Sequence, residues 1–338
     1  MQRRRDDFLT FSRLTNVVVV QDKNLGDSLL TTPMIKCLKR LAPNAKLTVI
    51  CKHESFPIFD CVDGDITCVS SESSITSLVG VIARAEIVFL TRPSSRYAFL
   101  CRLVRVPFVS HRLSSKWIRP RWEVPHYNNL KRHVAEKNLD LLRRVGAVIE
   151  QSDKRLIFAG GHKSLPAYNK FEALRGCIII HPGTRWLFKT PQLHFWIAVI
   201  QRLKKAGYQC VLTGDAVGQE GQLLDAIASK TECGSLAGQT SYCDLVGLLQ
   251  TSLGYLGVDT FCSHLAAAIG VPGLVLFGPT LPDLWGPWGA ANRLIVIQDE
   301  TKTCLGCGAD GCGGSKKSEC LDDLNASDIV MRLCSSLS

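Results

Sequence analysis

The sequence contains no long uninterrupted apolar run. Its longest apolar stretch, residues 265–277, is broken by Gly270 and Pro272. A membrane-spanning helix needs about 18 to 20 consecutive apolar residues, so no such helix is expected. Arg3, Arg4 and Arg5 precede a segment without a continuous apolar core, so we expect no signal peptide. Because 46% of residues are hydrophobic and 21% charged, the composition is that of an ordinary soluble globular protein.

A disulfide framework is also not expected. The chain has 15 cysteines, an odd number, without an export signal, which favours reduced thiols in a cytoplasm. Many of them, such as Cys37, Cys177 and Cys210, stand inside apolar stretches and are interpreted as small core residues. The formal net charge of +10 favours an acidic partner or simply maintains solubility.

The order of apolar segments predicts two α/β domains. A length of 338 residues suggests two domains, and no short internal repeat is visible. Strands are predicted at residues 16–20, 46–51, 86–90, 177–181, 209–213, 253–257 and 273–277. Helices are predicted at about 27–41, 130–145, 192–206, 220–230 and 263–269. Residues 92–129 are expected to form loops and short helices, and two doubly wound domains would bring strand ends to a ligand.

The first polar motif, Asn24-Leu25-Gly26-Asp27-Ser28, lies between a predicted strand and a helix. Asp27 falls at the helix start, where a carboxylate caps backbone N–H groups and gains from the helix dipole. Capping alone would explain this residue. The functional alternative is a general base beside the ligand.

Two further motifs follow strands of the second predicted domain. His181-Pro182-Gly183-Thr184 with Lys189 forms a glycine-containing loop of the kind that binds phosphate, or an ordinary connection with a solvated lysine. Asp259-Thr260 leads into a helix whose N–H groups could bind an anion, and His264 in that helix is either a core residue or a ligand contact.

Taken in order, these motifs resemble those of the ADP-heptose:lipopolysaccharide heptosyltransferases, glycosyltransferase family 9. The resemblance covers about residues 16–330 and is most like the heptosyltransferase III branch. It is carried by Gly26-Asp27-Ser28-Leu29-Leu30-Thr31-Thr32-Pro33, His181-Pro182-Gly183 with Lys189, Ser235-Leu236-Ala237-Gly238-Gln239-Thr240, Asp259-Thr260 to His264, and Phe277-Gly278-Pro279-Thr280.

The resemblance implies a GT-B fold, in which two Rossmann-like domains face each other across a cleft. It divides the chain into an acceptor domain at 1–165, a nucleotide-sugar domain at 166–325 with a cysteine-rich tail at 304–320, and a C-terminal helix at 326–338. It also implies an inverting transfer of heptose from ADP-L-glycero-D-manno-heptose to the lipopolysaccharide inner core, with no metal or other cofactor required for catalysis.

The site residues follow from the same resemblance. Asp27 would be the base. The donor site would comprise Thr184, Lys189, Glu220, Asp259, Thr260 and His264. Many family members have glycine after the Asp-Thr pair, where this chain has Phe261, which puts direct backbone contact with phosphate at that point in question.

A basic segment, residues 92–121, is interpreted either as a solvated surface or as an acceptor platform beside an anionic inner membrane. It carries Arg92, Arg96, Arg102, Arg105, Lys116, Arg119 and Arg121, interleaved with Trp117. We expect Arg92, Arg96, Arg119 and Arg121 to bind the acceptor, with the protein peripheral at the cytoplasmic face of the membrane.

The tail holds Cys304, Cys307, Cys312 and Cys320 in glycine-rich sequence. Four thiols within 17 residues could bind structural zinc or an iron–sulfur cluster, although the usual pair of C-x2-C motifs is absent. Free thiols or local disulfides are the alternative. Other readings of the chain are the same fold with another nucleotide sugar or acceptor, or a basic nucleic-acid module; the tail has few clustered cations, so no nucleic-acid partner is expected.

Overall fold

The computed structural model describes residues 8–62, 65–115, 117–125, 127–129, 131–158, 170–289 and 291–337. The chain forms two compact units, Met1–Phe158 and Ala159–Ser338. The domain boundary predicted between residues 165 and 166 lies outside the described residues. In the described part of the chain, no helix combines the length and the apolar character that crossing a bilayer requires.

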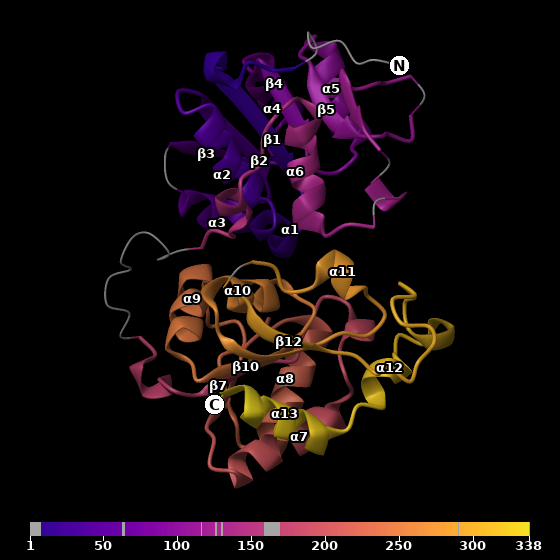
Figure 1. The fold of residues 1–338 in the computed structure, drawn as a ribbon. Helices are drawn as coiled ribbons and strands as arrows, with labels where there is room; N and C mark the ends of the chain where they lie inside the picture. Colours follow the sequence, from indigo (N-terminus) through magenta and orange to yellow (C-terminus); the bar gives the residue numbers. More distant parts are fainter. Residues whose placement is uncertain are drawn as a thin grey trace. The chain divides into compact units, whose positions relative to one another are not determined.

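The first unit is built on a parallel sheet of six strands in the order β3-β2-β1-β4-β5-β6 (Figure 1). All of its pairings are parallel, as expected when helices connect successive strands. The strands are β1 (Asn16–Gln21), β2 (Lys46–Cys51), β3 (Ile66–Ser70), β4 (Ile87–Leu90), β5 (Phe108–His111) and β6 (Trp122–Val124).

Helices cover both faces of this sheet because the central strands contain consecutive buried apolar residues, as in Val17 to Val20 of β1. Val17 and Val19 pack into one cluster with α2 and α6, whereas Val18 and Val20 pack into another with α4 and α5. The helices are α1 (Leu25–Leu29), α2 (Thr32–Leu41), α3 (Phe56–Asp60), α4 (Ile75–Ala83), α5 (Ser95–Leu103) and α6 (Val134–Arg144).

The single helix predicted at about 27–41 is wrong, because the structure has two helices there, α1 and α2. Pro33 occupies the first turn of α2. Proline lacks an N–H and clashes with the preceding turn, so it is tolerated at a helix start and not in its interior. The break leaves Asp27 on a short helix of its own, directly after β1.

The interpretation of residues 92–129 as loops and short helices is only partly right. The segment contains α5, but it also contributes two strands, β5 and β6, to the sheet. Both strands are short, and β6 has only three residues. Runs this short give little periodicity by which to recognise them.

The second unit repeats the architecture with the order β12-β11-β10-β7-β8-β9. Its strands are β7 (Ile178–His181), β8 (Cys210–Leu212), β9 (Gly234–Ser235), β10 (Gly254–Val258), β11 (Pro272–Leu276) and β12 (Arg293–Ile297). Its helices are α7 (Leu193–Lys205), α8 (Gly218–Thr231), α9 (Tyr242–Thr251), α10 (Phe261–Ile269), α11 (Pro282–Trp285), α12 (Glu319–Asp322) and α13 (Ala326–Leu337).

One core of this unit joins β7 and β10 to α7, α8 and α13 through residues such as Ile178, Trp196 and Ile329. On the other side of β10, Tyr255 is buried against Cys262 of α10. The two six-stranded sheets, each with helices and parallel strands, confirm the predicted α/β fold of two doubly wound units. Short 3-10 turns also occur at Phe11–Arg13, His53–Ser55, Tyr127–Asn129, Gln151–Lys154, Glu172–Leu174, Leu187–Lys189 and Cys312–Gly314.

Candidate active site

The two sheets share one strand order, which locates a ligand-binding edge in each unit. Counted from the first strand of each unit, both sheets read 3-2-1-4-5-6. In this arrangement the chain leaves β1 and β4, or β7 and β10, toward opposite faces, and ligands bind at the carboxyl ends of these neighbouring strands. The loops after these four strands are therefore the places to look for chemistry.

In the first unit, the loops after β1 and β4 bring Asp27 and Arg92 together. The Arg92 Nη2 donates to the Asp27 Oδ1 over 2.6 Å. Their side chains are only 11% and 20% exposed, so the ion pair is largely removed from solvent. Arg92 was expected to bind the acceptor, and the structure places its guanidinium on the predicted base.

Buried polar side chains form hydrogen bonds with the backbone around Asp27. The Gln21 Nε2 donates to the Asp27 carbonyl oxygen over 3.1 Å and to the Thr31 Oγ1 over 2.8 Å. The Thr31 hydroxyl donates to the same carbonyl over 2.8 Å. Buried hydrogen bonds of this kind fix local geometry, because breaking them would leave polar groups without partners.

The Tyr127 ring forms a platform for Arg92, and the sequence did not predict this platform. The Arg92 guanidinium lies 4.2 Å from the centroid of its ring, and the Lys137 Nζ lies 4.3 Å from it. Lys137 is only 3% exposed, and burial together with the nearby Arg92 lowers its pKa. Burial also raises the pKa of Tyr127. A Tyr ring face attracts cations, so the stack restrains Arg92 against Asp27.

The other predicted acceptor residues have contacts with neighbouring side chains. Arg96 lies at the exposed start of α5, with its guanidinium 5.3 Å from the Tyr97 ring centroid. Arg119 pairs with Glu123 over 3.5 Å, and Arg121 stacks on Trp122 at 4.6 Å. These cations belong to the outer part of the segment that contains α5 and β6.

In the second unit, the loops after β7 and β10 form a corresponding ion pair. The Lys189 Nζ donates to the Asp259 Oδ2 over 2.6 Å, and the Thr280 hydroxyl donates to the same oxygen over 2.8 Å. Asp259 is 5% exposed. Thr280 was quoted as part of a motif but was not assigned to the site. Its position after β11 places it at the same edge of the sheet as Asp259.

The helix that follows Asp259 begins at the predicted residues. Thr260 is the N-cap of α10, and its backbone N–H donates to the Ser263 Oγ over 3.3 Å. His264 is buried one turn into the helix, at 3% exposure. Phe261 is the first helical residue, so a side chain stands where many family members have glycine.

Glu220 of α8 lies directly behind the loop after β7. A Cβ atom built on Gly183 would come within 2.4 Å of the Glu220 side chain, so a larger residue there would displace that carboxylate. The Glu220 Oε1 accepts from the Asp215 N–H over 3.0 Å, but burial has the larger effect and raises the pKa of Glu220. Thr184 follows this glycine, and its hydroxyl oxygen accepts from the Trp186 N–H over 3.4 Å.

The cysteine tail packs next to the Lys189 loop. The Ser318 hydroxyl donates to the Phe188 carbonyl over 2.6 Å, and Gly308 N–H donates to the Pro279 carbonyl over 2.8 Å. Cys320 is buried, and burial together with the Cys312, Cys304 and Cys307 thiols raises its pKa to about 11. Cys304, Cys307 and Cys312 are exposed. Within the described residues, no three His, Cys, Asp or Glu side chains are grouped as a metal site.

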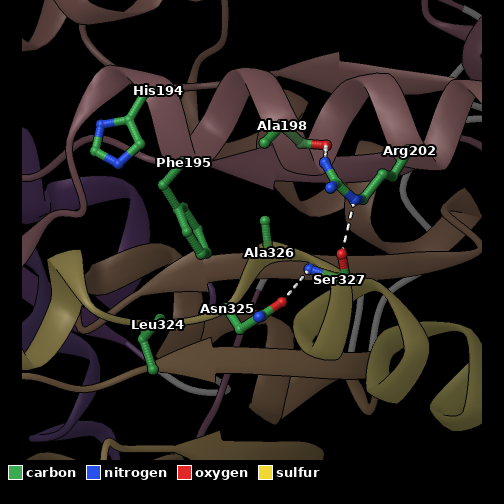
Figure 2. A pocket seen from close by; sticks show the side chains of 8 residues that line it. All are labelled: His194, Phe195, Ala198, Arg202, Leu324, Asn325, Ala326 and Ser327. Carbon is green, nitrogen blue, oxygen red and sulfur yellow. Dashed lines mark hydrogen bonds between the residues drawn. The ribbon is translucent and has the colours of Figure 1, made fainter.

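One cavity, of about 270 Å3, lies elsewhere in this unit, between α7 and the start of α13 (Figure 2). Arg202 donates to the Ser327 Oγ over 2.9 Å across it, and the Asn325 Oδ1 accepts from the Ser327 N–H over 2.8 Å. None of the predicted site residues lines it. The contacts join the two helices, and we interpret the cavity as a packing gap.

The family model that matches this chain is glycosyltransferase family 9 (heptosyltransferase), over residues 86–309. The chain belongs to this family. Residues 86–309 contain Arg92 and every predicted donor residue. Asp27 lies before this range, and its position rests on the geometry of the first unit. Family membership favours the enzyme over the nucleic-acid module among the functions considered from the sequence.

Named relatives of this family 9 glycosyltransferase point the same way. The chain is 25% identical to lipopolysaccharide heptosyltransferase 3 of Escherichia coli over 295 residues, which cover 78% of this chain and 82% of the relative. The structure of E. coli ADP-heptose lps heptosyltransferase II matches with a TM-score of 0.77 at 19% identity, covering 96% of this chain and 98% of the other. These matches agree with the predicted family and its fold.

A third similar structure is an iron-containing dodecameric glycosyltransferase from enterotoxigenic E. coli, TibC. It matches with a TM-score of 0.61 at 14% identity, covering 96% of this chain and 77% of the other. At this identity the likeness concerns the fold alone. The iron belongs to that protein, but it makes a direct metal measurement on this family 9 glycosyltransferase worthwhile.

Proposed function

We propose that this enzyme transfers heptose, with inversion, from ADP-L-glycero-D-manno-heptose to a hydroxyl of the lipopolysaccharide inner core, at the cytoplasmic face of the inner membrane. The observation that carries the proposal is the pair of charged clusters at corresponding sheet edges. One unit presents a carboxylate at its ligand-binding edge, and the other presents a lysine.

Asp27 is the proposed base. A sugar hydroxyl is a weak acid, so its proton leaves only as the new glycosidic bond forms, and a nearby carboxylate accepts it late in that step. Arg92 holds Oδ1, which leaves proton transfer to Oδ2. Attack on the anomeric carbon opposite the departing diphosphate gives inversion, and the acceptor carries the new bond while ADP leaves with its electron pair.

Lys189 is the proposed electrostatic partner of the diphosphate. The departing ADP gains negative charge in the transition state, and a fixed cation stabilises that charge most when it needs no reorganisation. Asp259 and Thr280 hold the lysine in place. Thr184, Thr260 and His264 complete the proposed diphosphate site, and Glu220 is proposed to lie near the ribose.

On the acceptor side, we propose that Arg96, Arg119 and Arg121 bind the phosphorylated core, with Arg92 acting mainly on Asp27. The residues that carry these roles are protein side chains alone, so no metal is assigned to the transfer step. The same fold with a different nucleotide sugar or glycan acceptor is the alternative function.

The test is a transfer assay with purified full-length enzyme, ADP-heptose and truncated lipopolysaccharide core acceptors, read by mass spectrometry. A product heavier by one heptose, with the anomeric configuration opposite to that of the donor, supports the proposal. ADP-glucose and UDP-glucose serve as matched donors. Transfer from either at the rate of ADP-heptose, or no transfer to any core acceptor, would contradict it.

A further inference from the structure

We propose that the outer face of α5, together with the loop that carries Trp117, is a docking surface for an anionic lipid bilayer. The outer face is defined by Arg96, Phe99, Arg102 and Leu103. The inference builds on the proposed function, because an acceptor anchored in a membrane must be reached there, but its test does not require transfer.

Helix α5 presents two contrasting sides. Tyr97, Ala98, Leu100 and Cys101 are buried in the core beneath it. Phe99 and Leu103 lie on the opposite side and are 56% and 61% exposed. The spacing of three and four residues places Arg96, Phe99, Arg102 and Leu103 on one stripe of the helix. Two large apolar side chains therefore face solvent between two arginines.

The loop after β5 extends this surface. Leu113 and Ile118 pack into the same cluster as the buried side of α5, which anchors the loop against that helix. Trp117, one residue before Ile118, is 93% exposed. A tryptophan that projects fully from an anchored loop has an amphipathic ring suited to the headgroup level of a membrane.

Charge identifies an anionic partner. Between residues 92 and 121 the sequence has seven arginines and one lysine, and no aspartate or glutamate. The first carboxylate beyond this stretch, Glu123, pairs with Arg112 over 2.9 Å and with Arg119 over 3.5 Å at its border. Arginine can extend its charge into water while its stem lies along apolar material. Exposed aromatics among such cations are typical of surfaces that lie on anionic membranes.

The position of this surface suits the chemistry of the same unit. Arg92, which holds Asp27, precedes α5 by only three residues. A bilayer against the outer face of α5 would hold lipid-anchored acceptors near the proposed base. The exposed apolar residues elsewhere, such as Val148 and Met331, are not surrounded in sequence by such a concentration of basic residues. Single exposed apolar residues are ordinary on protein surfaces.

The experiment measures co-sedimentation of full-length enzyme with vesicles of phosphatidylcholine, with and without phosphatidylglycerol. We expect binding only to the anionic vesicles, weakened by salt. The triple variant Phe99→Ser, Leu103→Ser, Trp117→Ser should bind them about tenfold more weakly. Val148→Ser, Met331→Ser is the matched control with equally exposed apolar residues and should bind as the parent does.

Two further measurements separate the possible failures. Transfer to a water-soluble truncated acceptor should be the same in the triple variant as in the parent. If the parent itself does not transfer heptose to this acceptor, the proposed function is contradicted, whereas the docking surface is not. Arg102→Gln alone, a conservative surface change, should weaken vesicle binding without altering the melting temperature. The proposal is overturned if the parent does not bind anionic vesicles, or if it binds neutral vesicles equally well. It is also overturned if the control variant loses as much vesicle binding as the triple variant, or if an oligonucleotide binds and competes with the vesicles.

Discussion

Arg92 and Asp27 illustrate how one contact changes the meaning of two residues. The sequence suggested an acceptor-binding arginine and a separate base. The 2.6 Å ion pair joins them and assigns Arg92 to the base, with Tyr127 and Lys137 behind it. Side chains this close are coupled, and their substitutions are not expected to be additive.

Asp27→Asn should abolish most turnover while keeping the fold. Asparagine is nearly isosteric and remains compatible with the helix start, but it cannot accept the acceptor proton. Loss of a general base typically lowers kcat by about 100- to 10,000-fold. The measurements are kcat with saturating acceptor and the Kd for ADP, with Asp328→Asn, an exposed carboxylate on α13, as control. A kcat near that of the parent would remove Asp27 from the mechanism.

Lys189→Ala should weaken use of the donor. It removes a charge from the proposed diphosphate contact, worth about 1.5–3 kcal/mol, so kcat/KM for ADP-heptose should fall roughly 10- to 100-fold. It also leaves the buried Asp259 without its cation, so the melting temperature must be measured in parallel. Lys302→Ala removes a surface lysine that pairs with Asp323 and serves as the control. Unchanged donor kinetics would show that Lys189 only holds Asp259.

At the scale of elements, the sequence predicts most interior strands and misses the edges. The central strands β1, β2, β4, β7, β8, β10 and β11 were all predicted, because strands buried on both faces are continuous apolar runs. The four edge strands β3, β6, β9 and β12 were missed, and so was β5, an interior strand of only four residues. They are short or face solvent on one side: β9 has two residues, and β12 alternates buried and exposed positions.

The same distinction applies to the candidate site. The positions of Asp27 and Lys189 after β1 and β7 could be predicted, because both strands are strongly apolar and the residues stand within a recognisable motif. The Tyr127 platform could not be predicted, because Arg92 and Lys137 approach the Tyr127 ring only in the folded chain. A contact between side chains 35 residues apart leaves no local periodicity.

The prediction for acceptor binding concerns Arg119 and Arg121, which precede β6. Arg119→Glu with Arg121→Glu should raise the acceptor KM and leave the donor KM unchanged, because both cations lie in the first unit and away from Lys189 in sequence. The reversal should act through repulsion of core phosphates. Arg332→Glu on α13 is the control for altered net charge. An equal rise in both KM values would contradict the division between acceptor and donor residues.

The cysteine tail is predicted to affect stability and not transfer. The Ser318 hydroxyl donates to the Phe188 carbonyl, and the Gly308 N–H donates to the Pro279 carbonyl. Among the hydrogen bonds of the described residues, none joins a tail thiol to Asp27, Arg92, Lys189 or Asp259. Elemental analysis should measure zinc and iron in purified protein, before and after chelation. We expect kcat to be unchanged by chelation, and the melting temperature to fall if metal was present. Loss of transfer at an unchanged melting temperature would make the tail catalytic.

The two units share one architecture, but the loops after their first strands carry residues of opposite charge. Both sheets have the same strand order, and in each the loops after the first and fourth strands form a short ion pair. In the first unit the base is on the first loop, whereas in the second the first loop supplies the cation. The shared fold explains where ligands bind, and the residues on these loops determine what each unit does.

Each unit also contains a histidine whose pKa is lowered by burial, which predicts acid lability of the whole molecule. His111 is fully buried in the first unit, and the pKa of His181 in the second falls to about 4. The folded pKa lies below the usual value of about 6.5, so protons bind more readily to the unfolded chain. The stability contribution is therefore present above pH 6.5 and is lost as the pH falls toward 4.

Urea unfolding at pH 7.5 and pH 5 tests this prediction. Most carboxylates remain ionised at pH 5, so the histidines dominate the change. For His181, we expect a loss of at most about 2 kcal/mol, from the fall of its pKa to about 4 in the folded protein. His181→Asn can keep a hydrogen bond to the Thr213 hydroxyl, which lies 2.9 Å from the His181 Nδ1, while removing the titration. The variant should therefore lose less stability between the two pH values than the parent does. An identical loss in both proteins would show that other groups cause the acid response.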